Sequence, residues 1–191
     1  MQVADLCDWA RKRRRRQALC AWGICCDKCC TRSGQARSYW VDIQIHIARD
    51  ADASAISETI IKTLRESNAR DYPPDIIDRV IESFSPSNIL RFLTERQVLV
   101  ATLDSQIVAT ASLDQDIVRS VFVDPDFQGM GVGRQLMKSI QSLAMDTGFN
   151  LLRVPSSVTA EGFYASLGFE KIRDEFHQTE RTIIMAKKLK R

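Results

Sequence analysis

VFVDPDFQGMGVGRQLM, residues 121–137, carries three glycines at alternate positions, Gly129, Gly131 and Gly133. A strand-like run precedes the glycines and a helix-like run follows them. Glycine loses more backbone entropy on folding than any other residue, so three of them at the start of a helix indicate a need for bare main chain. We interpret the stretch as a loop whose backbone N–H groups lie close to a bound molecule.

Three kinds of phosphate-binding loop compete for this interpretation. A P-loop requires GxxxxGK[ST], and no Lys-Ser or Lys-Thr follows these glycines. A dinucleotide loop requires GxGxxG in an opening βαβ unit, whereas this GxGxG follows three β-rich runs. The third kind is a helix N-terminus, where free N–H groups and the helix dipole hold a pyrophosphate without a lysine. We favour it over a turn without a ligand, and Gln128 and Arg134 would add side-chain donors.

Hydrophobic periodicity divides the chain after residue 40 into strands and helices. Residues 41–48, VDIQIHIA, alternate strictly, which predicts a half-buried strand with its isoleucines buried and His46 exposed. Apolar residues at helical spacing then predict helices, the first capped by Asp50 or Asp52 and the second starting at Pro73-Pro74. A third helix follows the break at Ser85-Pro86.

Residues 97–123 contain three β-rich runs separated by DS and DQD, the pattern of an antiparallel meander. The helix after the glycine loop ends at Gly148. The predicted order is strand, helices, three strands, helix, strand, helix and two strands, which is a mixed α/β domain. The elements after Gly148 are expected at residues 149–155 (strand), 156–168 (helix, capped by Ser157), 169–174 and 181–189 (strands).

The first 40 residues of this 191-residue chain differ in composition from the rest. They contain all six cysteines and nine of the 27 Lys and Arg residues, but only three of the 24 Asp and Glu residues. The remainder has 18 basic and 21 acidic residues, so the excess positive charge belongs to the first 40. We predict a basic N-terminal extension over residues 1–40 without a fold of its own, and one domain over residues 41–191.

The extension has other interpretations. Its RKRRRR run at residues 11–16 is typical of nucleic-acid binding, nuclear targeting or a solvated charged segment. Cys26 and Cys29 form a CxxC pair, but zinc usually requires a second pair, and palmitoylation beside basic residues is a further alternative. We predict no metal site and no nucleic-acid partner. No apolar run approaches 18 residues, so we predict no membrane span, and the cysteine-free body fits a cytoplasmic protein.

The glycine stretch resembles the acetyl-CoA pyrophosphate loop of the GNAT superfamily, the acetyl-CoA-dependent N-acetyltransferases. Their signature (Q/R)xxGx(G/A) falls here on Gln128, Gly131 and Gly133. Downstream, AEGFYASLGFEKI resembles the FYxxxGF segment of the same enzymes. The order of elements also matches over about the last 150 residues, and the first 40 have no counterpart.

The resemblance implies a central, mostly antiparallel sheet that splays open and is flanked by helices. Strand 117–123 would part from strand 149–154, and the pantetheine arm of acetyl-CoA would lie between them. A backbone N–H near residues 121–123 would polarise the thioester carbonyl. The residues implied to bind acetyl-CoA are Val121, Phe122, Val123, Gln128, Gly129, Met130, Gly131, Val132, Gly133 and Arg134.

The resemblance also implies direct acetyl transfer to a primary amine, with Tyr164 as general acid for the leaving thiolate. The general base is open, with Asp116 and Glu161 as candidates. The acceptor, a small molecule or a peptide, would bind near residues 52–95, and the acidic body favours a cationic amine. A homodimer through strands such as 181–189 is conceivable. The alternatives are a non-catalytic acyl-CoA sensor and a nucleic-acid-binding protein acting through residues 11–16.

Overall fold

A computed structural model describes residues 43–177 and 180–190 of the chain. The extension over residues 1–40 lies outside the described residues. The predictions for it therefore stay predictions: the boundary at residue 40, the Arg-rich run, and zinc or palmitoyl groups on its cysteines. Within the described residues, no helix is long and apolar enough to cross a membrane.

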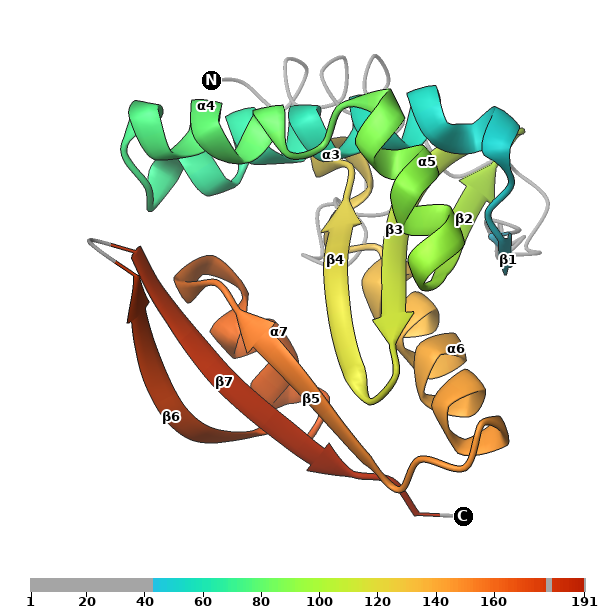
Figure 1. Cartoon of the computed structure of the whole chain (residues 1–191), viewed down its shortest axis with the longest axis vertical. Coiled ribbons are helices and arrows are strands. Elements are labelled where there is room, and N and C mark those ends of the chain that lie inside the picture. The colour runs from blue at the N-terminus through green and yellow to red at the C-terminus, as the bar shows by residue number, and fades with distance from the viewer. Residues whose placement is uncertain (1–42, 178–179, 191) are drawn as a thin grey trace, which may run out of the picture. The chain divides into compact units, whose positions relative to one another are not determined.

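Three helices, α3 (Ala53–Glu66), α4 (Pro74–Glu82) and α5 (Pro86–Glu95), lie together across one end of the sheet (Figure 1). Pro74 and Pro86 each occupy the first turn, where their missing N–H costs nothing, as the prolines predicted. The predicted cap of α3 is wrong, because Asp52 makes no side-chain cap bond there. Its carboxylate instead accepts the N–H of Arg49 (2.8 Å) and closes the short 3-10 helix η1 (Asp50–Asp52).

Seven strands form one sheet in the order β1-β2-β3-β4-β5-β7-β6, and every neighbouring pair is antiparallel except β4 with β5. This confirms the predicted fold class and the predicted meander. Two details of the prediction are wrong. Ile47 on the edge strand β1 is 62% exposed, and β7 is an inner strand that pairs on both sides, so it has no free edge for a second subunit. The strands are β1 (Gln44–Ile47), β2 (Gln97–Leu103), β3 (Gln106–Asp114), β4 (Ile117–Val123), β5 (Leu151–Ser156), β6 (Glu170–His177) and β7 (Glu180–Lys188).

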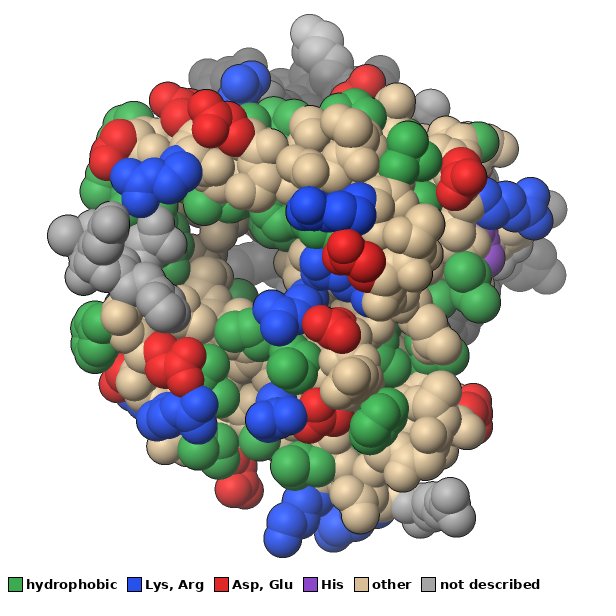
Figure 2. Space-filling model, in the orientation of Figure 1, with side chains coloured by type: hydrophobic (Ala, Val, Ile, Leu, Met, Phe, Trp, Pro, Cys, Tyr) green, Lys and Arg blue, Asp and Glu red, His purple; other side chains and the backbone are tan. Residues whose placement is uncertain are grey.

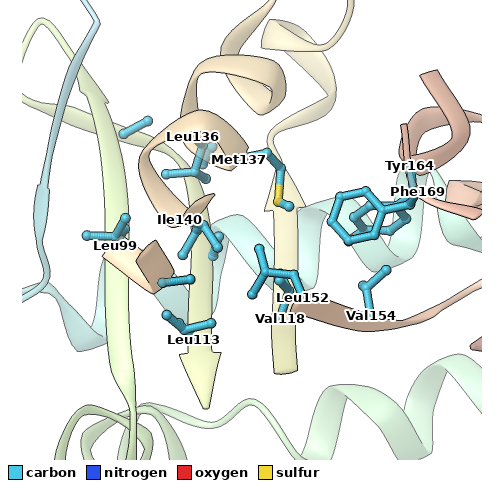
Figure 3. Close-up of a cluster of buried hydrophobic side chains, with 14 of the residues drawn as sticks. Leu99, Leu113, Val118, Leu136, Met137, Ile140, Leu152, Val154, Tyr164 and Phe169 are labelled. Carbon is cyan, nitrogen blue, oxygen red and sulfur yellow. The ribbon is translucent and has the colours of Figure 1, made fainter. Parts of the chain in front are cut away.

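The helices α6 (Val132–Asp146) and α7 (Glu161–Ser166) pack against the strands and form the main core with them. Leu136, Met137 and Ile140 of α6 are fully buried against strands β2 to β5 (Figure 3). Gly148 ends α6 in the left-handed region (φ +93°), as predicted. The predicted cap Ser157 makes no side-chain cap bond, and its segment divides into η4 (Val158–Ala160) and α7. Each Å² of apolar surface removed from water stabilises the fold by about 25 cal/mol, and this buried face holds α6 in a fixed position.

Strands β4 and β5 meet at one end only. Their single paired position is Ile117 opposite Arg153, and from there the two strands diverge toward α4 (Figure 1). At the closed end Arg153 makes a bidentate ion pair with Asp116 (Nε–Oδ2 2.7 Å, Nη2–Oδ1 2.8 Å), and its backbone N–H donates to the carbonyl of Asp116 (2.8 Å). Three bonds therefore hold the two strands where the sheet is still closed.

Asp116→Asn should weaken this closed end by at most about 1 kcal/mol at pH 7, because the Arg153 side chain is half exposed and screened. The hydrogen bonds from Arg153 lower the pKa of Asp116. Because the pKa of Asp116 is lower in the folded chain, its ionised form stabilises the fold. This contribution to the free energy of unfolding is complete above the unfolded-state pKa of about 3.9, and it is lost as the pH falls through the folded-state pKa. Urea unfolding should therefore separate the variant from the parent at pH 7 and show a smaller difference near pH 2.5.

Glu170→Gln, an exposed carboxylate on β6, is the control and should leave the unfolding free energy unchanged within about 0.5 kcal/mol. A difference between Asp116→Asn and the parent that persists undiminished at pH 2.5 would contradict the ion-pair account.

Candidate active site

Strand β4 is interrupted by a bulge where it leaves β5. Ser112 of β3 lies opposite Arg119 and Thr110 lies opposite Phe122, so Ser120 and Val121 share one partner position. Ser120 has φ +52°, a left-handed conformation that costs a serine free energy. The extra residue re-aims the strand, as bulges next to active sites commonly do.

The carbonyl of Val123, at the end of β4, accepts from Thr63 Oγ1 (3.1 Å) and from Gln128 Nε2 (2.9 Å). These donors lie away from β3, and in an extended strand the N–H of a residue points to the same side as its carbonyl. The N–H of Val123 therefore also faces away from β3.

The glycine loop ends in a helix N-terminus without a side-chain cap. Gly131 is the N-cap of α6 with φ +83°, and Gly129 has φ +75°. A side chain at either position would be strained, which explains two of the three glycines. The N–H groups of the first turn have no acceptor within the helix, and they lie at the positive end of its dipole.

Gly133 also has a packing role that the sequence did not predict. A Cβ atom there would lie 3.2 Å from Phe163 Cζ and 3.3 Å from Val123 Cγ2. Close packing of α6 on α7 and β4 is therefore a sufficient reason for a small residue here, and cofactor binding at Gly133 stays a prediction. Through Phe163 the glycine loop is in direct contact with the helix that carries Tyr164.

The two predicted side-chain donors of the loop are placed differently. Gln128 uses its amide Nε2 within the protein, since this atom donates to Val123 O and to Ser67 Oγ (3.0 Å). Arg134 is exposed and makes a single longer contact, from Nη2 to Ser166 Oγ (3.3 Å). Arg134 is therefore the better placed of the two to bind an anion in front of the helix.

Tyr164 lies on the inner face of α7 with 5% of its surface exposed. Its ring packs edge-to-face on Phe163 (centroids 5.2 Å apart) and on Phe169 (5.6 Å). Figure 3 shows Tyr164 and Phe169 beside each other at the edge of the core. Burial raises the pKa of Tyr164 well above its ordinary value of about 10, so the phenol keeps its proton throughout the working pH range.

A cavity of about 690 Å³ runs along the open side of β4. It extends from the glycine loop, past β4, β5 and Tyr164, to the inner face of α4. Figure 2 shows the molecule hollowed between the helical layer and the splayed half of the sheet. The cavity brings together every predicted site residue except Met130, whose side chain is exposed outside it: Val121, Phe122, Val123, Gln128, Gly129, Gly131, Val132, Gly133, Arg134 and Tyr164.

The cavity also contains residues that the sequence did not indicate. Ser120 lines it, as do Tyr72 and Thr159. The hydroxyl of Tyr72 accepts the N–H of Val158 (3.0 Å), and Thr159 Oγ1 donates to Asp71 (2.7 Å). These two bonds join the connection before α4 to the connection before α7, two segments more than 80 residues apart, which no local pattern could have revealed.

Neither candidate base lies in this cavity. Asp116 is engaged by Arg153 at the closed end of the strands, and that partner lowers its pKa, so it is a poor proton acceptor. Glu161 starts α7 but does not line the cavity. A second hollow, of about 770 Å³ beside β1 and α3, contains none of the predicted site residues. Among the described residues, no cluster of His, Cys, Asp and Glu could hold a metal ion.

Comparison with known proteins identifies the fold. The sequence model of the acetyltransferase (GNAT) domain matches residues 68–189. The uncharacterized N-acetyltransferase YafP of Escherichia coli K12 is 25% identical over 134 residues, which is 70% of this chain and 85% of YafP. A GCN5-related N-acetyltransferase structure from Rhodopseudomonas palustris superposes with a TM-score of 0.73 at 23% identity, covering 76% of this chain and 95% of that one. PaiA N-acetyltransferase from Thermoplasma acidophilum, solved with coenzyme A, gives 0.66 at 19% identity, covering 76% and 98%.

The chain belongs to the GNAT acetyltransferase family, since the match spans more than half of its length. This confirms the predicted enzyme class, an acetyl-CoA-dependent N-acetyltransferase. The roles of the individual site residues stay predictions.

Gly133→Val should lower the free energy of unfolding by about 1–3 kcal/mol, because the new side chain overpacks Phe163 and Val123. Gly162→Val is the matched control, since a Cβ atom at Gly162 meets nothing within 4 Å, and it should change stability by less than about 0.5 kcal/mol. Urea unfolding of both variants measures the difference. Equal stability of the two variants would show that Gly133 is not required for packing.

Proposed function

We propose that this chain transfers the acetyl group of acetyl-CoA directly to a primary amine at the open end of the β4–β5 gap. The observation that supports this most is that one cavity contains both the predicted pyrophosphate loop and Tyr164. The closed end of the gap is occupied by the Asp116–Arg153 pair, so the reacting groups have to meet toward α4.

In this proposal the first turn of α6 holds the pyrophosphate. Its uncapped N–H groups supply donors and the dipole supplies the positive potential, while Arg134 adds a formal charge at the same place. The free side of β4 would pair with the pantetheine arm. The N–H of Val123 faces away from β3, and a donor in this position can stabilise the oxyanion that forms when the amine attacks the thioester carbonyl.

Tyr164 would assist the departure of the sulfur. As the carbon–nitrogen bond forms and the carbon–sulfur bond breaks, negative charge moves onto the sulfur, and the phenol can donate a hydrogen bond to it. A thiol has a pKa of about 8.5 and the buried phenol has a much higher one. Complete proton transfer from Tyr164 is therefore uphill, and we assign it the role of a hydrogen-bond donor whose proton is always present.

Three further points belong to the proposal. The acceptor is a small-molecule or peptide amine that enters from the side of α4. A cytoplasmic location fits the cysteine-free domain. A homodimer, if it forms by strand pairing, would use the sheet edges β1 or β6, because β7 is internal.

Arg134→Ala should weaken acetyl-CoA binding about tenfold or more, since one charge-assisted hydrogen bond is worth about 1.5–3 kcal/mol. Isothermal calorimetry with the full chain measures the dissociation constant. Arg65→Ala, an exposed arginine at the end of α3, is the control and should bind within about twofold of the parent. Unchanged binding by Arg134→Ala would remove Arg134 from the cofactor site.

Tyr164→Phe should lower kcat about 100-fold with the affinity for acetyl-CoA unchanged, since a hydrogen bond to a charged group is worth about 1.5–3 kcal/mol. Tyr72→Phe removes the other tyrosine hydroxyl of the cavity and should change kcat less than about tenfold. Because burial raises the pKa of Tyr164, the parent enzyme should show no alkaline loss of activity below pH 9.5 from this group.

Steady-state assays with the best amine of a screened panel measure kcat for both variants and the pH dependence of the parent enzyme. An alkaline limb below pH 9.5 that disappears in Tyr164→Phe would contradict the assignment of a permanently protonated phenol. Binding of acetyl-CoA without turnover of any amine would instead favour the non-catalytic sensor.

A further inference from the structure

The part of the cavity beyond the thioester position has an apolar wall. Ile76, Ile77 and Val80 of α4 line it, together with Phe84 and Phe122. The rings of Phe84 and Phe122 pack edge-to-face with centroids 5.4 Å apart. A wall of this kind stabilises a ligand through the apolar surface that the ligand removes from water.

The same cavity lacks negative charge. Among the described residues that line it there is no Asp, Glu, His or Lys, and its charged side chains are Arg134 and Arg181. Two carboxylates on the flanking segments are engaged: Asp174 accepts from Arg181 and from Lys171, and Asp71 accepts from Thr159. Asp75 and Glu161, in the first turns of α4 and α7, do not line the cavity. The acidic excess of the domain therefore does not extend to the cavity, and the sequence-based preference for a cationic amine has no support there.

This charge pattern selects among amines by their basicity. An ammonium ion against the apolar α4 wall loses its water without gaining a carboxylate partner among the residues that line the cavity. An amine with the basicity of a lysine side chain, pKa about 10.4, is neutral in about one molecule in a thousand at pH 7.4. An α-amine, with a pKa of about 7.8, is neutral in roughly one in four. Without a base in the cavity, the enzyme has to take up the neutral form.

We propose that the acceptor is a weakly basic amine of the α-amine type, carried on an apolar body that packs against the α4 wall. This inference rests on the proposed function. The hydroxyl of Tyr72 fits such a ligand, because its oxygen already accepts the N–H of Val158 and its proton can be donated to an acceptor carbonyl next to the amine.

Four amines test the inference with the full chain and saturating acetyl-CoA, the acetylated product being measured by mass spectrometry. L-Phenylalaninamide has both features, 2-phenylethylamine has the apolar body with a strongly basic amine, glycinamide has the weak base without the body, and spermidine has neither. At pH 7.4 we expect kcat/KM for L-phenylalaninamide to exceed that for 2-phenylethylamine about 100-fold or more. It should exceed that for glycinamide about tenfold or more. The advantage over 2-phenylethylamine should shrink about tenfold between pH 7.4 and pH 9.

Val80→Asp provides a gain-of-function test, because it adds the missing carboxylate to the wall. The variant should raise the ratio of kcat/KM for 2-phenylethylamine over L-phenylalaninamide at pH 7.4 about tenfold or more. Asp78→Asn, which changes an exposed carboxylate on the outer face of α4, should leave the ratio unchanged. Thermal unfolding establishes that both variants are folded, and the four-amine comparison on the parent chain stands even if Val80→Asp does not fold.

Faster acetylation of spermidine or 2-phenylethylamine than of L-phenylalaninamide at pH 7.4 would overturn the acceptor class while leaving the acetyltransferase function intact. Equal rates for glycinamide and L-phenylalaninamide would overturn the role of the apolar wall. Bound acetyl-CoA with no acetylation of any of the four amines also counts against this acceptor class. Failure to bind acetyl-CoA by calorimetry would instead overturn the proposed function itself.

Discussion

The structure depends on one interrupted strand pair. Strands β4 and β5 run parallel and meet only where Ile117 lies opposite Arg153, next to the ion pair between Arg153 and Asp116. Had the pairing continued along both strands, the backbone of β4 would be satisfied within the sheet and no cavity would exist between its two halves. The bulge at Ser120 and the divergence of β5 leave β4 with one paired side and one free side. That free side is what an extended ligand can bind.

The remaining elements keep this opening in shape. Helix α6 is fixed by Leu136, Met137 and Ile140 in the core, so its N-terminus and the glycine loop are held at the end of β4. Gly133 brings α6 close to Phe163, and Phe163 packs on Tyr164. The glycine-loop end of the cavity and Tyr164 are therefore connected through two adjacent packing contacts. A substitution in the glycine loop can therefore shift Phe163 and, through it, the phenol of Tyr164.

Features that depend on neighbouring residues in the sequence were predicted, whereas features that depend on contacts between distant residues were not. The element order, the meander and the prolines that start α4 and α5 depend on local periodicity and backbone chemistry, and they were predicted. The left-handed conformation of Ser120 was not, because serine gives no signal for positive φ. The helix face of Ile76, Ile77 and Val80 was recognised as apolar, but an apolar stripe looks the same whether it faces a core or a cavity. Asp116 was a candidate base until its position beside Arg153 was known.

By itself the sequence determined the family and the order of the elements, since glycine spacing and the FYxxxGF segment are local and specific. The tertiary structure decided which residues line the cavity, and therefore which charged side chains set its electrostatic potential. Net charge is a property of the whole chain, whereas the potential at a buried amine is set by the few charges within about 10 Å of it. An acidic domain can therefore enclose a cavity whose described charges are two arginines, and only the fold decides where those charges lie.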